Sequence, residues 1–460
     1  MTLHEAKSLK RRKTSADVTA GERNCAVCSR EPGEAVVEIS TLEPDLEKLI
    51  RANAPGVEGF DAVCARCARL FERGKESILN DAALKKDGSH VLSTPVRLDA
   101  VARFTGKGAT IAFLDSGFYP HPDLTKPADR IIGYRSLLHK EGDDSQLYKP
   151  DVASWHGMMT SVVATGNGWL SNGFYRGLAP DAKVVLVKLA KTGRITEQNI
   201  QDGLEWVLEN RTKFGVNIVN ISAGGDFEQS YLHDSLSQVV EECASKGIVV
   251  VCAVGNAGHL PTHPVFPPAS APSCIAVGGL DDNNSIDRSR RGMYRSSYGP
   301  TVDGLQKPEV IAPSIWVPAP ILPGTPTAKQ AEFLEALDNA PDKDLHQKIR
   351  ANPGIVIELD AALDRPVHSL RQIIILKLRQ ENVINKYYKY VDGTSFSAPI
   401  VSSVVAQMIE ANPSLTVQEI KRILISTAER LPHYEVDRQG WGVIDPRSAV
   451  ETAASVSGEQ

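Results

Sequence analysis

Four polar residues, far apart in the sequence, have the side chains that nucleophilic acyl transfer requires. Asp115 lies in the motif Asp-Ser-Gly, His156 in His-Gly, and Ser395 in Gly-Thr-Ser-Phe-Ser-Ala-Pro. A hydroxyl can attack a carbonyl carbon when an imidazole takes its proton and a carboxylate orients that imidazole. The fourth residue, Asn256, carries an amide that could donate a hydrogen bond to the resulting oxyanion. These residue types predict hydrolysis through a covalent intermediate.

Short apolar runs that alternate with helical segments predict the framework for these residues. Runs of this kind, without polar alternation, are typical of parallel strands buried on both faces. The sequence therefore predicts an α/β fold, a three-layer sandwich around a mainly parallel sheet. Asp115 and Asn256 would follow strands at the carboxyl edge, where ligands bind. The strand-like runs cover residues 109–114, 184–189, 217–221, 248–254 and 274–277.

The other two residues are expected at the starts of helices. His156 precedes an apolar stretch over residues 158–165, and Ser395 precedes another over residues 400–411. The positive end of a helix dipole favours negative charge near a hydroxyl at that position. Each motif alone also has a structural explanation, because Asp-Ser-Gly is common in turns and an isolated histidine often serves packing.

Taken together, the motifs resemble those of the subtilisin-like (S8) peptidase family. Their order along the chain, Asp, His, Asn and Ser, is the order in that family. The resemblance covers about residues 92–450. Three further motifs support it: Gly177-Leu178-Ala179-Pro180, Asn220-Ile221-Ser222-Ala223-Gly224-Gly225, and Lys307-Pro308-Glu309 followed by Ala312-Pro313.

This resemblance implies a serine endopeptidase and assigns a role to each candidate. Ser395 would be the nucleophile, and His156 the general base and acid. Asp115 would orient His156 and stabilise its charged form. Asn256 and the backbone N–H of Ser395 would form the oxyanion hole.

The resemblance also implies where a substrate binds. An edge made of Ser222, Ala223 and Gly224 would pair with the main chain of an extended peptide. The pocket for the side chain before the scissile bond would lie between this edge and a second segment, with its floor near Val265. Ala257 at the rim favours an apolar side chain there. The second segment consists of Ala253, Val254 and Gly255.

Two departures from the family pattern concern packing and calcium. Met158 and Met159 stand where the family usually has threonine and histidine, which bears on packing and not on proton transfer. Asn167 and Asn172 lie where many relatives bind calcium, but no carboxylate accompanies them. No calcium site is therefore assigned.

Four of the seven cysteines form two Cys-x-x-Cys pairs. The first pair is Cys25 and Cys28, and the second is Cys64 and Cys67, at the expected start of a helix. This pattern matches the ligand number and local spacing of a zinc site with four cysteine ligands. It predicts a small zinc-stabilised domain over residues 1–90, in which zinc is structural; a redox dithiol and structural free thiols are the alternatives.

Residues 1–90 precede the predicted peptidase domain, residues 91–455, and two roles are open for them. In related peptidases this segment is often an inhibitory propeptide, although the common propeptide has no cysteines. The first role is a zinc-stabilised propeptide or autoinhibitor. The second is a permanent adaptor that recruits a substrate or partner.

An insert of about residues 318–388 precedes the predicted nucleophile. Helical spacing predicts helices over residues 328–337 and 369–385, and the Pro-rich stretch 318–326 predicts a linker. Both ends of the insert lie near the helix that starts at Ser395. The insert would therefore either decorate the surface or overhang the cleft, as a lid or as a substrate exosite, and a protein partner could bind through it or through residues 1–90.

Composition narrows the remaining possibilities. The 460 residues are 42% hydrophobic and 23% charged, a composition typical of a soluble globular protein. The net charge of −5 predicts no overall electrostatic attraction to nucleic acid or membranes. No secretory signal or bilayer-spanning stretch is visible, and the cysteine usage agrees with a cytoplasmic location; non-classical export is the alternative.

Two other functions compete with peptide hydrolysis. A catalytically silent scaffold would keep the fold and use the zinc module for partners. An esterase is less well supported, because the nucleophile lies in Gly-Thr-Ser-x-Ser and not in Gly-x-Ser-x-Gly.

Overall fold

A computed structural model describes residues 36–53, 62–65, 68, 91–140, 142–190 and 194–456. Its central sheet has the strand order β12-β8-β7-β6-β3-β5-β4, and β9 (Gly292–Met293) pairs with β8. Neighbours along this order are parallel, whereas β9 is antiparallel. The strands are β3 (Thr110–Asp115), β4 (Ile131–Ser136), β5 (Lys183–Lys188), β6 (Ile218–Ile221), β7 (Val249–Ala253), β8 (Ile275–Asp281) and β12 (Val310–Pro313). The five predicted strands and the mainly parallel sheet are confirmed.

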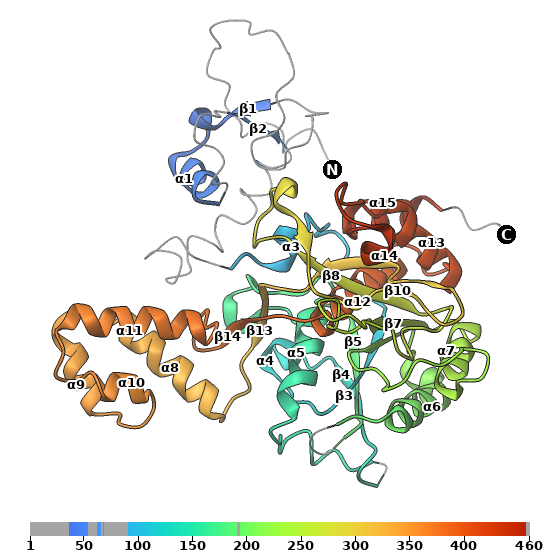
Figure 1. Cartoon of the computed structure of the whole chain (residues 1–460), viewed down its shortest axis with the longest axis horizontal. Coiled ribbons are helices and arrows are strands. Elements are labelled where there is room, and N and C mark those ends of the chain that lie inside the picture. The colour runs from blue at the N-terminus through green and yellow to red at the C-terminus, as the bar shows by residue number, and fades with distance from the viewer. Residues whose placement is uncertain are drawn as a thin grey trace, which may run out of the picture.

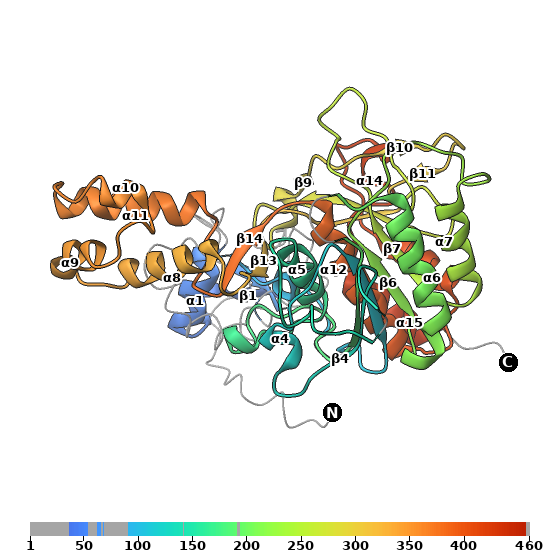
Figure 2. The same cartoon turned by 90° about the horizontal axis from the view of Figure 1, so that it is seen from below.

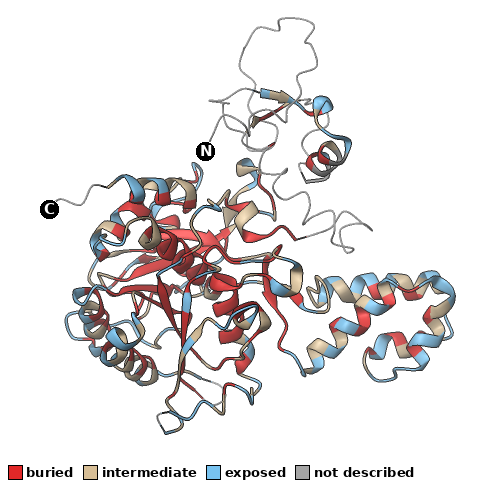
Figure 3. Ribbon diagram, turned by 180° about the vertical axis from the view of Figure 1, so that it is seen from behind, coloured by how far each residue is buried: buried red, intermediate tan, exposed pale blue. Residues whose placement is uncertain are grey.

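Helices cover both faces of this sheet. In β3, Ile111 and Phe113 join one apolar layer, and Ala112 and Leu114 join the other. Because both faces are covered, the strand is apolar at nearly every position, and Figure 3 shows the central strands almost entirely buried. One face packs against α5 (Ser154–Thr165), α12 (Thr394–Ala411), α13 (Val417–Thr427) and α15 (Pro446–Ser455). The other packs against α6 (Glu197–Phe214) and α7 (Ser235–Ser245) (Figure 2).

Short elements complete this part of the chain. They are α3 (Thr94–Arg97), α4 (Pro122–Thr125), η4 (Trp169–Ser171), η5 (Arg288–Arg290), β10 (Gly299–Pro300), β11 (Gln306–Lys307) and α14 (Val436–Gln439). Among the described residues, no helix is both long enough and apolar enough to cross a membrane.

Between β12 and α12 the chain forms a helical extension with an apolar core of its own. Its base is an antiparallel ribbon of β13 (Val317–Pro320) and β14 (Tyr388–Val391). Its helices are α8 (Pro326–Asp338), η6 (Asp342–Asp344), α9 (Leu345–Arg350), α10 (Ile357–Asp360) and α11 (Val367–Gln380). Leu334, Leu345 and Leu370 are among the fully buried side chains of this separate core. Figures 1 and 2 show the helices projecting away from the sheet.

The extension confirms its two predicted helices and corrects the predicted linker. Residues 318–326 are not one linker, because Pro318 and Pro320 belong to β13 and face Tyr390 and Tyr388 across the ribbon. Prolines that lack a backbone donor are tolerated in such a ribbon, since each strand has only one partner.

The described part of the N-terminal region contains β1 (Val36–Glu38), η2 (Ile39–Thr41), α1 (Pro44–Asn53) and β2 (Ala62–Cys64). β1 pairs with β2 antiparallel, so that Val36 lies opposite Cys64. The predicted helix begins one residue later than expected, because Cys64 is the last residue of β2, where pairing with β1 extends the backbone, and Ala65 and Ala68 are helical. Cys25, Cys28 and Cys67 lie outside the described residues.

Candidate active site

Asp115 and His156 form a hydrogen-bonded pair at the carboxyl edge of the sheet. Asp115 is the last residue of β3 and is buried, and His156 lies in the first turn of α5. The Nδ1 of His156 is 2.8 Å from Oδ1 and 2.9 Å from Oδ2 of Asp115. The backbone N–H of Ser116 donates to Oδ1 at 2.7 Å, and Thr160 Oγ1 donates to Oδ2 at 3.2 Å. A carboxylate held in this way fixes the proton on Nδ1, which leaves Nε2 to accept another proton.

Gly157 explains why glycine follows the histidine. A Cβ at this position would lie 2.2 Å from the carbonyl oxygen of Gly117 and 2.9 Å from the Cβ of Asp115. Any side chain would push α5 away from the loop that follows β3. The His-Gly motif therefore reflects the close approach that brings the imidazole to the carboxylate.

The environment of His156 raises its pKa. Burial favours the neutral imidazole and would lower the pKa, but the charge and the hydrogen bond of Asp115 act in the opposite direction. The net result is a pKa above the ordinary 6.5. An imidazole whose charged form is stabilised in this way is suited to take a proton from a neighbouring hydroxyl.

Ser395 lies in the first turn of α12 and is partly exposed. Its Oγ donates to the carbonyl oxygen of Ser222 at 3.4 Å, which is long for a hydrogen bond. The neighbouring ring of Phe396 has its centroid 5.8 Å from that of His156. The structure thus brings Ser395 to the same corner of the sheet as Asp115 and His156, with its hydroxyl only weakly engaged.

Asn256 follows β7 and is held by the start of the same helix. Its Oδ1 accepts from the backbone N–H of Thr394 at 2.9 Å and from Thr394 Oγ1 at 3.2 Å. Because a backbone N–H can only donate, this contact identifies Oδ1 and leaves Nδ2 as the free donor. A Cβ built on Gly393 would lie 3.7 Å from this Nδ2 and 3.8 Å from the backbone nitrogen of Ser395. Asn256 Oδ1 lies 3.9 Å from the same point, so the side-chain amide of Asn256 and the backbone nitrogen of Ser395, the two predicted oxyanion donors, both lie next to Gly393.

The residues predicted to bind substrate lie on adjacent strand ends. Ser222 follows β6, and its Oγ donates to the carbonyl oxygen of Ser395 at 2.8 Å. Ala223, Val254 and Val265 share one apolar cluster. The remaining predicted residues lie beside them: Gly224 follows Ala223, Ala253 ends β7, and the backbone N–H of Gly255 donates to Thr394 Oγ1 at 3.2 Å.

A cavity of about 470 Å³ opens beside the imidazole and includes residues that sequence motifs did not indicate. Besides Asp115, His156 and Ala223, its lining contains Ser116, Val152, Ala153, Trp155 and Ile195. Trp155 is exposed, and its ring meets that of His156 edge to face at 5.2 Å. A tryptophan next to the predicted base was the signal that could have identified this wall.

The structure places the residues at which the sequence departs from the family pattern. Met158 and Met159 are buried in the layer between α5 and the sheet, which agrees with a packing role. Asn167 Nδ2 donates to the carbonyl oxygen of Lys126 at 2.6 Å. Within the described ranges, no group of three or more His, Cys, Asp or Glu side chains could hold a metal ion.

The fold and the site together define a hydrolase with a serine–histidine–aspartate arrangement on a parallel α/β sheet. The subtilase family profile matches residues 106–442, a range that contains all four candidate residues. The chain belongs to the subtilase family, and its class is that of subtilisin-like serine proteases.

Individual relatives agree with this assignment. The chain is 30% identical over 355 residues to Serine protease AprX of Bacillus subtilis (strain 168), which covers 75% of this chain and 67% of AprX. It is 31% identical over 212 residues to Subtilisin BL of Lederbergia lenta, which covers 46% of this chain and 65% of that protein. Among solved structures, fervidolysin from Fervidobacterium pennivorans, a keratinolytic enzyme related to subtilisin, superposes on this chain with a TM-score of 0.52. The match covers 78% of this chain and 45% of the fervidolysin chain. At 19% identity, that match supports the fold alone.

Proposed function

We propose that the protein is a serine endopeptidase that hydrolyses peptide bonds through an acyl-enzyme on Ser395. The observation that carries the proposal is the pairing of His156 Nδ1 with the buried carboxylate of Asp115, at 2.8 and 2.9 Å. Ser395 and Asn256 lie at the same edge of the sheet.

In the first step, Ser395 Oγ attacks the carbonyl carbon of the peptide bond while His156 Nε2 takes the hydroxyl proton. Asp115 stabilises the imidazolium, and Asn256 Nδ2 with the Ser395 N–H stabilises the oxyanion. The imidazolium then gives its proton to the departing amine, and the C–N bond breaks. Water then attacks the acyl carbon while His156 Nε2 takes a proton from it; the bond between the acyl carbon and Ser395 Oγ breaks, and the imidazolium returns the proton to Oγ, which releases the new carboxyl product and regenerates Ser395.

The proposed substrate is an extended protein or peptide segment. Its main chain pairs with residues 222–224, and an apolar side chain enters the pocket bounded by residues 253–255 and Val265. Support comes from the apolar cluster that Ala223, Val254 and Val265 share.

Hydrolysis of a quenched fluorescent peptide library and of casein tests this function. The wild type should cleave both, whereas Ser395→Ala should retain its fold and cleave neither. Equal cleavage by the two proteins would show that the activity comes from elsewhere. A folded wild type that cleaves nothing would favour the silent scaffold.

We also propose that Cys25, Cys28, Cys64 and Cys67 bind one structural zinc ion and that residues 1–90 regulate an intracellular enzyme. Cys64 is buried at the end of a two-stranded ribbon, where a thiolate ligand would be shielded from water. Zinc measured in the full-length protein should be about one per chain and should fall in a Cys64→Ser variant. A wild-type content no higher than that of the variant would contradict the zinc site.

The role of residues 1–90 is tested by comparing the wild type with Ser395→Ala by mass spectrometry. A propeptide should be lost from the wild type only. If both remain full length while the wild type cleaves casein, residues 1–90 act as an adaptor.

The extension at residues 318–388 is the proposed exosite for folded substrates. Deleting residues 325–385 should leave cleavage of a short peptide intact and reduce cleavage of a folded protein. Equal effects on the two substrates would remove this role.

A further inference from the structure

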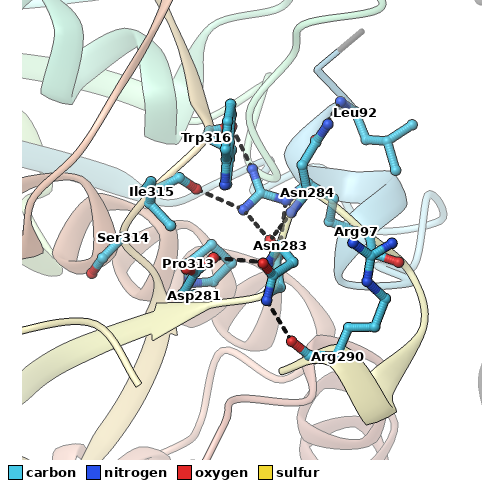
Figure 4. Close-up of polar contacts among 12 residues, drawn as sticks. Leu92, Arg97, Asp281, Asn283, Asn284, Arg290, Pro313, Ser314, Ile315 and Trp316 are labelled. Atoms are coloured by element: carbon cyan, nitrogen blue, oxygen red, sulfur yellow. Dashed lines mark hydrogen bonds and ion pairs between the residues drawn. The ribbon is translucent and has the colours of Figure 1, made fainter. Parts of the chain in front are cut away.

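The segment that enters the peptidase region, residues 91–98, is built into the interior. Leu92 donates its backbone N–H to Asn284 Oδ1 at 2.8 Å (Figure 4), and Tyr175 donates its hydroxyl to the carbonyl oxygen of Val91 at 3.3 Å. Six of its residues are each at most 7% exposed: Val91, Leu92, Ser93, Thr94, Arg97 and Leu98. The segment is therefore a structural part of the peptidase region.

Arg97, the last residue of α3, makes more contacts than an ion pair requires. Its side chain is fully buried, and its Nε and Nη2 donate to the two carboxylate oxygens of Asp282 at 2.8 and 2.7 Å. The fork also donates to the backbone carbonyl oxygens of Ile315, at 2.8 Å, and Trp316, at 2.5 Å (Figure 4). Asp282 balances the charge, and the two additional bonds hold the turn between β12 and β13.

The backbone of this turn has an unfavourable conformation at Trp316, which contacts from outside the turn must stabilise. Trp316 has a φ of 59°, a left-handed conformation that bulky residues rarely adopt. Its ring packs against Tyr390 of β14, with the centroids 4.8 Å apart. Arg97 binds the carbonyl oxygen of the strained residue, so its guanidinium stabilises the conformation that places Trp316 on the ribbon.

The same turn holds the segment of the predicted nucleophile. Ser314 accepts the backbone N–H of Gly393 on its carbonyl oxygen at 2.7 Å, and its Oγ contacts Ser397 Oγ. Gly393 and Ser397 each lie two residues from Ser395, one on either side. A shift of residues 314–316 would therefore move both supports of the nucleophile.

We propose that Arg97 is a positioning residue that fixes Ser395 through the turn at residues 314–316. This inference rests on the proposed function, because the geometry it maintains is that of the nucleophile. It also means that the segment joining residues 1–90 to the peptidase region takes part in assembling the active site.

The test uses the full-length chain with Arg97→Ala, Arg97→Lys and the matched control Arg447→Ala. Arg447, on α15, binds Asp99, just beyond the same segment, at 2.9 Å, and its hydrogen bonds and ion pairs with the described residues go to Asp99 and Glu451 and not to the turn. The kcat and KM for a short peptide are measured below the unfolding temperature of each variant. We expect Arg97→Ala to lower kcat at least ~10-fold with KM nearly unchanged, because misplacing a reacting atom slows the chemical step. Arg97→Lys should recover part of kcat, and Arg447→Ala should retain it.

A second measurement does not depend on activity. In the Ser395→Ala background, hydrogen exchange of the peptide that contains Gly393 should be faster with either Arg97 substitution and unchanged with Arg447→Ala. If Arg97→Ala does not fold, the kcat of Arg97→Lys and the hydrogen exchange of its Gly393 peptide decide whether Arg97 positions Ser395.

Two results would overturn the proposal: unchanged kcat and exchange in a folded Arg97 variant, or equal losses in Arg447→Ala. If the wild type is inactive but the Arg97 variants show faster exchange at Gly393, the result would count against the proposed function and still support the contact between Arg97 and the segment of Ser395.

Discussion

Replacing Asn256 by alanine tests the proposed oxyanion hole. The side chain has two separate functions in the structure, since Oδ1 accepts from the Thr394 N–H at 2.9 Å while Nδ2 remains to donate. Removing one such donor costs about 2.7–4 kcal/mol of transition-state stabilisation, or about 10²–10³ in kcat. The oxyanion exists only after attack, so KM should change little.

Alanine also removes the acceptor of the buried Thr394 N–H, which would destabilise the fold by about 1–3 kcal/mol. Asn256→Asp separates the two effects, because a carboxylate keeps the acceptor and loses the donor. Both variants should lose kcat, but only Asn256→Ala should unfold at lower denaturant concentration. Asn352→Ala, in the extension and far along the chain, is the matched control and should behave as wild type.

The assay is steady-state hydrolysis of a short peptide, combined with denaturant unfolding at the same pH. A kcat within about threefold of wild type in both Asn256 variants would refute the oxyanion assignment, because a lost donor costs far more. A rise in KM without loss of kcat would show that Asn256 binds substrate and not the transition state.

The further predictions concern the histidine, the helix that carries it and the base of the extension. Asp115 raises the pKa of His156 above 6.5, and proton transfer needs the neutral imidazole, so kcat/KM should rise with pH through an apparent pKa above 6.5. Asp115→Asn should shift this rise in kcat/KM to lower pH and reduce kcat about 10⁴-fold. A rise that stays at the same pH in Asp115→Asn would contradict the pairing of His156 with Asp115. The same raised pKa means that the stabilisation from charged His156 is complete below 6.5 and is lost as pH rises through the folded-state value. Gly157→Ala should destabilise the protein by about 1–3 kcal/mol and lower kcat, because the new Cβ would overlap the carbonyl oxygen of Gly117. In the control Gly292→Ala, the new Cβ would lie 3.3 Å from a tyrosine hydroxyl, so stability and kcat should change little in the same unfolding and rate assays. Tyr388→Phe should destabilise the protein by about 1–3 kcal/mol in denaturant unfolding, because the buried Asp123 loses the 2.6 Å hydrogen bond that the Tyr388 hydroxyl donates to it. Tyr390→Phe, whose hydroxyl makes a 3.4 Å bond, should cost much less, and equal losses in the two variants would show that the Tyr388–Asp123 hydrogen bond does not stabilise the base of the extension.

The sheet could be predicted because strands buried on both faces have a simple signature. Residues such as Ile111 and Ala112 point to opposite layers yet are both apolar, so the run shows no alternation. The four candidate residues could be found because each lies where a strand ends or a helix begins. Their proximity follows from the parallel order of the strands.

Other features depend on contacts that no local pattern contains. Pro318 and Pro320 favour a linker, but pairing with β14, far along the chain, makes them part of a strand. Cys64 ends a strand because Val36 pairs with it. Arg97 lies in a helix of four residues, and its partner Asp282 is 185 positions away. The cavity wall combines the start of α5 with Ile195, from a separate loop, and the two share no motif.

Labelling with a fluorophosphonate probe tests the proposed acyl-enzyme on Ser395 most directly, because the probe reacts with an activated serine. We expect a covalent adduct on the peptide that contains Ser395 in the wild type, no adduct in Ser395→Ala, and much slower labelling in His156→Ala. Absence of labelling in the folded wild type, with residues 1–90 either present or removed, would contradict the proposed mechanism, as would equal labelling of Ser395→Ala.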